Sequence, residues 1–139
     1  MRIVLDTNVL IASFATQGIC HQLFEICLDQ HDICLSKFIL EELSENLHKK
    51  LKMPQEQIHA IGNFLKAHVE TISHGKLSEK VCRDQKDDAI LALAEAAGAE
   101  YIVTGDDDLL ALKSFGKATI VSPRAFWEAL RDRGKVSDR

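Results

Sequence analysis

Acidic side chains gather where predicted strands end and predicted helices begin. Asp6 and Asp106 each follow a short apolar run, residues 3–5 and 101–103, of the kind found in strands buried on both faces. Because parallel strands end at one edge of a sheet, where ligands bind in open α/β folds, we expect these two carboxylates to converge. Further acids lie on two predicted helices. The start of an alanine-rich helix has Asp84, Asp87 and Asp88, and the predicted helix at 37–52 has Glu41, Glu42 and Glu45.

A cluster of this kind predicts a divalent metal site. Two carboxylates about 5 Å apart repel by roughly 3 kcal/mol at an effective dielectric constant near 20. Three or four of them therefore require a cation or strongly raised pKa values. Hard oxygen ligands suit Mg²⁺ or Mn²⁺. A pair of such ions could generate hydroxide and stabilise both oxygens of an in-line phosphodiester displacement.

Each acid taken alone has a simpler explanation. Asp is among the commonest helix N-caps, and negative charge at a helix N-terminus suits the helix dipole. Asp84, Asp88 and Asp107 are good candidates for such caps. The acids that end two buried strands are harder to explain in this way, so the combination, rather than any one residue, indicates metal chemistry.

The rest of the pattern supplies the elements that would position these acids. Thr7 and Asn8 are suitable N-caps for the first helix, Pro54 can open the fourth, and Gly98 should end the alanine-rich one. Short apolar runs predict strands at 3–5, 33–35, 69–72, 101–103 and 118–121. Apolar residues at helical spacing predict helices at 9–14, 20–28, 37–52, 54–68, 89–97, 109–112 and 123–130.

Alternating strands and helices predict an α/β fold. We expect a three-layer α/β/α sandwich with a mainly parallel central sheet, into which the helices at 37–52 and 54–68 are inserted as a helical hairpin. One domain would cover residues 1–130, and residues 131–139 would form a charged, frayed tail.

Composition limits the class of protein. A single chain of 139 residues with a formal charge of −4 (17 basic against 21 acidic residues) is not expected to coat nucleic acid by bulk charge. Its four cysteines include no Cys-x-x-Cys pair and are expected to be free thiols in a reducing cytoplasm. No apolar run approaches the ~20 residues of a membrane span, and the chain starts without a signal-peptide pattern. We therefore expect a cytoplasmic protein with no membrane partner.

The order and spacing of the acidic motifs resemble those of PIN-domain nucleases. The chain has Ile-Val-Leu-Asp-Thr-Asn-Val-Leu at 3–10, Glu-Leu at 42–43, Asp-Gln-Lys-Asp at 84–87 and Val-Thr-Gly-Asp-Asp-Asp-Leu at 103–109. The resemblance extends to about Leu130 and is greatest to the small prokaryotic toxins of type II toxin–antitoxin pairs, the VapC-type ribonucleases. It implies bound Mg²⁺ or Mn²⁺, cleavage of single-stranded RNA and a small antitoxin partner. We also expect a homodimer formed through helices.

The resemblance also implies roles for individual residues. The four catalytic and metal-binding acids would be Asp6, Glu42, Asp87 and Asp106. Asp108 would add a metal ligand, and Asp84, Asn8 and Thr104 would support or orient these acids. The residues alone leave open whether Glu41 or Glu42, and whether Asp84, Asp87 or Asp88, is the ligand.

Two basic residues, Arg83 and Lys86, flank the third acid. They could contact a phosphate, although solvated surface positions explain them more simply.

Other activities fit the sequence less well. An aspartate-nucleophile phosphatase would need an acid two positions after Asp6, where Asn8 stands. No Gly-x-Ser-x-Gly motif supports a serine nucleophile. A metal- or RNA-binding module without turnover remains the alternative to a nuclease, and a cleavage assay separates the two.

Overall fold

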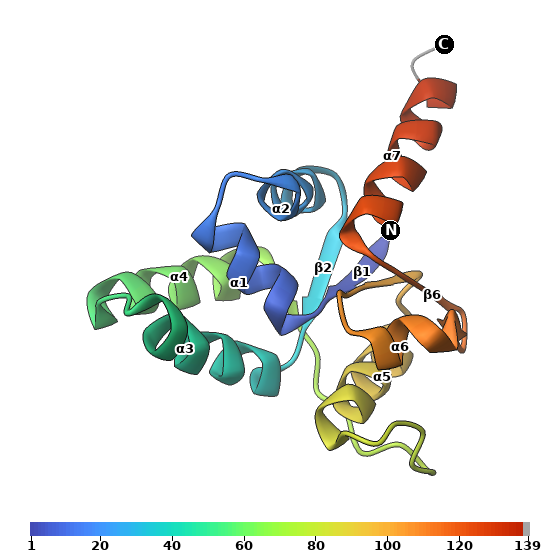
Figure 1. Ribbon diagram of the computed structural model, residues 1–139, viewed down its shortest axis with the longest axis horizontal. Helices are drawn as coiled ribbons and strands as arrows, with labels where there is room; N and C mark the ends of the chain where they lie inside the picture. Colours follow the sequence, from blue (N-terminus) through green and yellow to red (C-terminus); the bar gives the residue numbers. More distant parts are fainter. Residues whose placement is uncertain (138–139) are drawn as a thin grey trace.

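The computed structural model describes residues 1–137, with side chains through residue 133. Six strands form one sheet in the order β3-β2-β1-β4-β6-β5, and all neighbours are parallel except the β5–β6 pair. This confirms the predicted, mainly parallel sheet (Figure 1). The strands are β1 (Arg2–Leu5), β2 (Asp32–Leu35), β3 (Glu70–Thr71), β4 (Tyr101–Val103), β5 (Ser114–Phe115) and β6 (Ala118–Val121).

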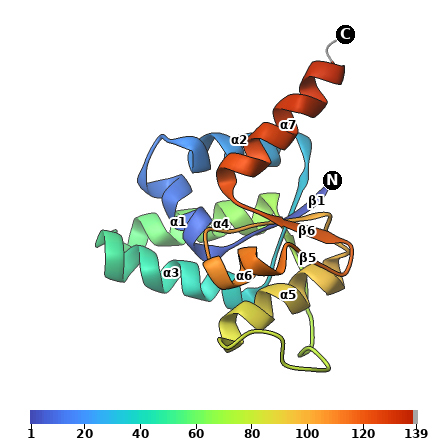
Figure 2. The same ribbon diagram turned by 45° about the vertical axis from the view of Figure 1, so that its right-hand side comes forward.

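Helices cover both faces of the sheet and complete the three layers. In both views α1 to α4 lie together on one side, while α5 and α6 lie on the other (Figures 1 and 2). None of the described helices is both long enough and apolar enough to span a membrane. Their bounds are α1 (Thr7–Ala15), α2 (Ile19–Gln30), α3 (Lys37–Leu51), α4 (Gln55–His68), α5 (Gln85–Ala97), α6 (Asp107–Leu112) and α7 (Pro123–Ser137).

The apolar runs that predicted strands and helices form the core. Ile3, Val4 and Leu5 of β1 are fully buried, because β1 lies inside the sheet with helices on both sides. In the helical hairpin of α3 and α4, one apolar stripe of α3 faces inward and includes Leu43 and Leu47. Gly98 ends α5 in the left-handed conformation, as predicted. All four cysteines are free thiols, also as predicted.

Three boundaries differ from the prediction. The first helix begins at Thr7, directly after the strand, so that Asp6, and not Thr7 or Asn8, is the N-cap residue. Strand β5 was not predicted, because two residues are too short to show a period, and its turn to β6 uses the positive φ of Gly116. Helix α7 continues to Ser137 instead of ending at Leu130, since charged residues such as Arg and Lys favour helix and need no burial.

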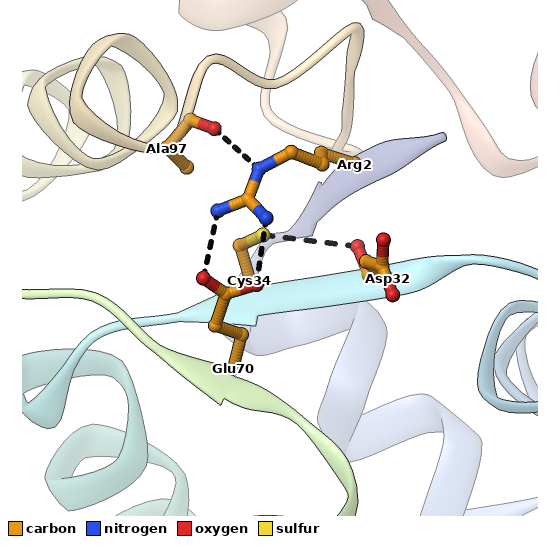
Figure 3. A network of polar contacts seen from close by, with 5 residues as sticks. All are labelled: Arg2, Asp32, Cys34, Glu70 and Ala97. Atoms are coloured by element: carbon orange, nitrogen blue, oxygen red, sulfur yellow. Dashed lines mark hydrogen bonds and ion pairs between the residues drawn. The ribbon is translucent and has the colours of Figure 1, made fainter.

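The two-residue edge strand β3 is tied to the body of the protein by Arg2. The Arg2 guanidinium reaches over β2 and donates two hydrogen bonds to Glu70, at 2.6 and 3.1 Å, and one to the carbonyl of Ala97 (Figure 3). That carbonyl lies at the C-terminal end of α5, where helices leave acceptors unsatisfied. Beside this network, the Cys34 thiol donates to the carbonyl of Asp32 at 3.7 Å. Arg2 therefore joins the edge strand, the central strand and the end of α5.

The geometry predicts unequal effects for the two ends of this ion pair. Arg2→Met removes the hydrogen bond to the Ala97 carbonyl as well as the pair, and that bond should be worth about 1 to 2 kcal/mol of unfolding free energy. Glu70→Gln removes only the charge of an exposed partner and should cost less. Urea unfolding of both variants checks this, and equal losses would contradict the role of the Ala97 contact.

Candidate metal centre

Strand pairing places the first acid of the site. Leu5 of β1 stands opposite Val103 of β4, so the next residues, Asp6 and Thr104, leave the sheet side by side. The Thr104 hydroxyl donates to Asp6 Oδ2 at 2.7 Å and accepts from the backbone N–H of Asp106 at 3.0 Å. Thr104 is fully buried. It therefore links the two strand-end acids, in agreement with the orienting position predicted for it.

Asp106 meets two further carboxylates beside this link. Oxygens of Asp87, Asp106 and Asp108 all lie within 4.8 Å of one another. Asp87 comes from the first turn of α5 and is buried. Asp106 Oδ1 accepts from the backbone N–H groups of Asp108 and Leu109, which caps α6 and leaves Oδ2 for other partners. Asp106 is thus both a helix cap and a member of the cluster.

Glu42 reaches the site from α3. Its Oε1 accepts a 2.6 Å hydrogen bond from the Thr7 hydroxyl, and its Oε2 lies 3.3 Å from Lys86 Nζ. The side chain of Glu42 is 18% exposed, whereas that of Glu41 is 61% exposed and lies 3.9 Å from Lys37. Of the two adjacent glutamates, the structure therefore brings Glu42 towards the acidic centre.

Thr7 is the residue that holds Glu42 in place, although the sequence indicated only a helix cap at Thr7. Its side chain is buried and is directed to α3, whereas the side chain of Asn8 is exposed. Within the described residues Asn8 makes no side-chain hydrogen bond, so its role in orienting the acids stays a prediction. A helix that starts immediately after the strand turns residue 7 inward and residue 8 outward, and this start was the missing information.

Two of the α5 acids have structural partners. Asp84 Oδ1 accepts from the backbone N–H of Lys86 at 2.9 Å and caps α5. Asp88 accepts from the N–H groups of Val81 and Cys82 and anchors the loop before the helix. Asp84 and Asp88 therefore act as caps or anchors, and Asp87 is the α5 residue that joins the three-carboxylate group.

Burial and like charges raise the affinity of the site for protons. Burial raises the pKa of Asp6, with further contributions from Asp106 and Glu42, against the hydrogen bond from Thr104. The pKa of Asp87 is raised to about 6, first by burial and then by the charges of its acidic neighbours, led by Asp106.

Two cations lie at the rim of the site. Arg83 contacts both carboxylate oxygens of Asp108, at 2.9 and 3.0 Å, with a side chain that is 87% exposed. Lys86 pairs with Glu42 and is also mostly exposed. Neither contacts Asp6, Asp87 or Asp106 in the described structure, so Asp108 is the member of the three-carboxylate group that has a cationic partner. An all-carboxylate donor set in which Asp6, Asp87 and Asp106 have no cationic partner fits a hard divalent cation.

Fold and site together define an α/β protein with a carboxylate cluster at the carboxyl edge of a parallel sheet. The model of the PIN domain family matches residues 2–108, and the chain belongs to this family. A search of curated proteins finds no match.

Solved structures of the same fold include VapBC2, VapC20 and FitAcB. A chain of VapBC2 from Rickettsia felis, bound to a promoter DNA fragment, aligns with a TM-score of 0.62 at 16% identity over 88% of this chain and 98% of its own. VapC20 of Mycobacterium tuberculosis, a toxin that cleaves the sarcin–ricin loop, aligns with a TM-score of 0.57 at 14% identity over 84% and 98%. FitAcB from Neisseria gonorrhoeae gives 0.54 at 16% over 87% and 97%. At these identities the likeness is one of fold.

The raised pKa of Asp87 gives a stability test of the cluster. A carboxyl group with a pKa near 6 in the folded state and 3.8 as its ordinary value binds protons more tightly when folded. In EDTA the wild type should therefore lose stability as pH rises from about 4 to above 6. Asp87→Asn removes this loss, so its melting temperature relative to wild type should increase over that range.

Thermal melts at pH 5 and pH 7.5 check this expectation. Asp107→Asn is the matched control, because Asp107 is exposed and lies outside the three-carboxylate group. Added Mn²⁺ should raise the melting temperature of wild type and of the control, and much less that of Asp87→Asn. A pH-independent difference between Asp87→Asn and wild type would contradict the clustered charge.

Proposed function

We propose that this PIN-domain protein is an endoribonuclease that uses Mg²⁺ or Mn²⁺ to cleave single-stranded RNA. The observation that carries the proposal is the group of Asp87, Asp106 and Asp108 within 4.8 Å, with Asp6 tied beside it through Thr104. Family membership and the fold shared with VapC proteins support a nuclease. Hard carboxylate donors support these two cations.

Each residue of the site has a role in this proposal. Asp6, Asp87, Asp106 and Asp108 would hold the cations, which when bound supply an activated water and stabilise negative charge on the phosphate. Thr104 fixes the orientation of Asp6, and Thr7 fixes that of Glu42. Glu42 would complete the acidic set from α3, on the side opposite to α5.

The basic rim would meet the phosphates. Arg83 and Lys86 are exposed and held by single carboxylates, so both can exchange a carboxylate partner for a phosphate oxygen at small cost. This arrangement would place positive charge where the RNA strand approaches, although the chain as a whole is negative.

A cleavage assay tests the proposal, with Glu41 as the matched control for its neighbour Glu42. Purified protein should cut unpaired RNA with Mn²⁺ or Mg²⁺, and EDTA should stop it. Asp6→Asn and Glu42→Gln should lower the rate roughly 100-fold or more while the proteins stay folded. Glu41→Gln should keep nearly full activity, because Glu41 is exposed and contacts only Lys37. Equal activity of wild type and Asp6→Asn would refute the assignment and leave a module without turnover.

We further propose that the protein is the cytoplasmic toxin of a toxin–antitoxin pair and forms a homodimer through helices. The support is that structures of the same fold include VapBC2 and FitAcB. The carboxylates of Asp6, Asp87 and Asp106, which have no cationic partner in the described structure, would accept an inserted Arg of a small antitoxin in place of the metal.

Isolation of the tagged protein from its native host should recover a small partner, and the free protein should have the mass of a dimer in solution. Absence of a partner, together with normal growth on induction, would refute the toxin role. It would leave nuclease chemistry untouched.

A further inference from the structure

A cleft of about 510 Å³ lies next to the acidic centre, and the metal site does not use it. It is formed where the first turn of α3, the loop of residues 72–84 and α5 meet. The loop runs beside α5 in both views (Figures 1 and 2). We call it the α3–α5 cleft, and the side chains that matter here are Phe38, His74, Lys76, Lys80, Lys86 and Ala92.

The apolar lining of the α3–α5 cleft includes the ring of Phe38 and two alanines of α5. Phe38 is 40% exposed, which is unusual for so large an apolar side chain, and Ala89 and Ala92 of α5 also line the cleft. Phe38 precedes Glu42 by four residues on α3, so the two lie on the same side of that helix, one turn apart. The exposed ring therefore lies beside the acidic centre.

The rim of the cleft is basic. Within the residues that the structure describes, Lys76 and Lys80 have no ion-pair partner. The cleft also contains two acids, Glu79 and Asp88, but Asp88 already accepts from two backbone N–H groups of the loop. The cleft is thus lined by three lysines, Lys76, Lys80 and Lys86, and by one carboxylate without a hydrogen-bond partner in the described part of the chain, that of Glu79. This local excess of positive charge occurs in a chain whose net charge is negative.

One ion pair and one sequence neighbour place the cleft beside the acidic centre. Lys86 lines the cleft and also pairs with Glu42 at 3.3 Å. On α5, Asp88 lines the cleft while its neighbour Asp87 belongs to the three-carboxylate group. A strand whose phosphate lies at the acids would therefore pass directly into the cleft.

We propose that the α3–α5 cleft binds one unpaired nucleotide of the RNA, next to the phosphate that is cut. Its base stacks on Phe38, and its phosphates contact Lys76 and Lys80. An exposed aromatic ring surrounded by cations is the arrangement by which proteins bind single strands. Bases in a duplex are already stacked and cannot reach the ring. The inference rests on the proposed ribonuclease function and names the part of the substrate that this site selects.

Binding of a labelled unpaired RNA 12-mer, measured by fluorescence anisotropy with Mg²⁺ in an Asp6→Asn background, tests the proposal without cleavage. Phe38→Ala should weaken binding about ten-fold, and Phe38→Trp should restore it. Phe64→Ala is the matched control, because Phe64 is 41% exposed but lies on α4 outside the cleft, and it should have no effect.

The salt dependence of binding distinguishes the contribution of base stacking from that of the phosphate contacts. Lys80→Ala should reduce the slope of log Kd against log salt concentration by about 0.7, the value for one lost contact to a single strand. Phe38→Ala should leave the slope unchanged. Lys66→Ala, which removes a lysine of α4 outside the cleft, should leave both affinity and slope unchanged. With an abasic strand of the same length, Phe38→Ala should lose its effect.

The outcomes distinguish this inference from the ribonuclease itself. If Phe38→Ala and Phe64→Ala bind RNA equally well and the wild type cuts RNA, nucleotide binding in the cleft is refuted and the ribonuclease proposal stands. Phe38-dependent binding without cleavage by wild type supports the cleft and overturns the nuclease. Absence of RNA binding overturns the cleft. Displacement of the RNA by a glutamate decapeptide, dependent on Lys80 but not on Phe38, would assign the cleft to an acidic peptide and overturn the proposal.

Discussion

The parallel pairing of β1 with β4 decides where the carboxylates of this protein lie. The N–H of Asp6 donates to the carbonyl of Val103 at 3.0 Å, and the N–H of Thr104 donates in turn to Val121 at 3.0 Å, so three neighbouring strands end in register. Because strand side chains alternate between faces, a slip of one residue would turn Thr104 away from Asp6 and separate the strand-end acids. The helices then add their acids to an edge that the sheet has already aligned.

Much of this arrangement could be predicted from local pattern. Apolar runs identified five of the six strands, and Gly98 marked the end of α5, whereas the residues alone left the choice between Glu41 and Glu42 open. Local pattern is insufficient where a distant element decides which side chain faces the site. Whether Thr7 or Asn8 faces the site depends on how closely α1 follows β1 and on the approach of α3, which no local pattern encodes. The length of α7 was underestimated because helix propensity, not burial, extends it.

The site combines a stabilising fold with a destabilising charge. Pairing of β1 with β4 holds the strand-end acids near one another, and both burial and the neighbouring acidic charges raise the pKa of Asp87. Its nearest cations are placed at the rim on exposed side chains, where ion pairs contribute little to stability. The centre therefore keeps its affinity for a cation, and the rim keeps cations that can change partners.

The acidic centre is also spread along almost the whole chain. The hydrogen bond between Thr104 and Asp6 joins residues 98 positions apart, and the edge on which they meet is completed only by β6. Contacts this distant in sequence form late, because a long loop must close first. A nascent chain on the ribosome therefore carries its first acid from the beginning of synthesis but has no assembled centre until its final third has emerged. The acidic centre is therefore absent while the chain is being made, and a product that ends before residue 104 lacks it.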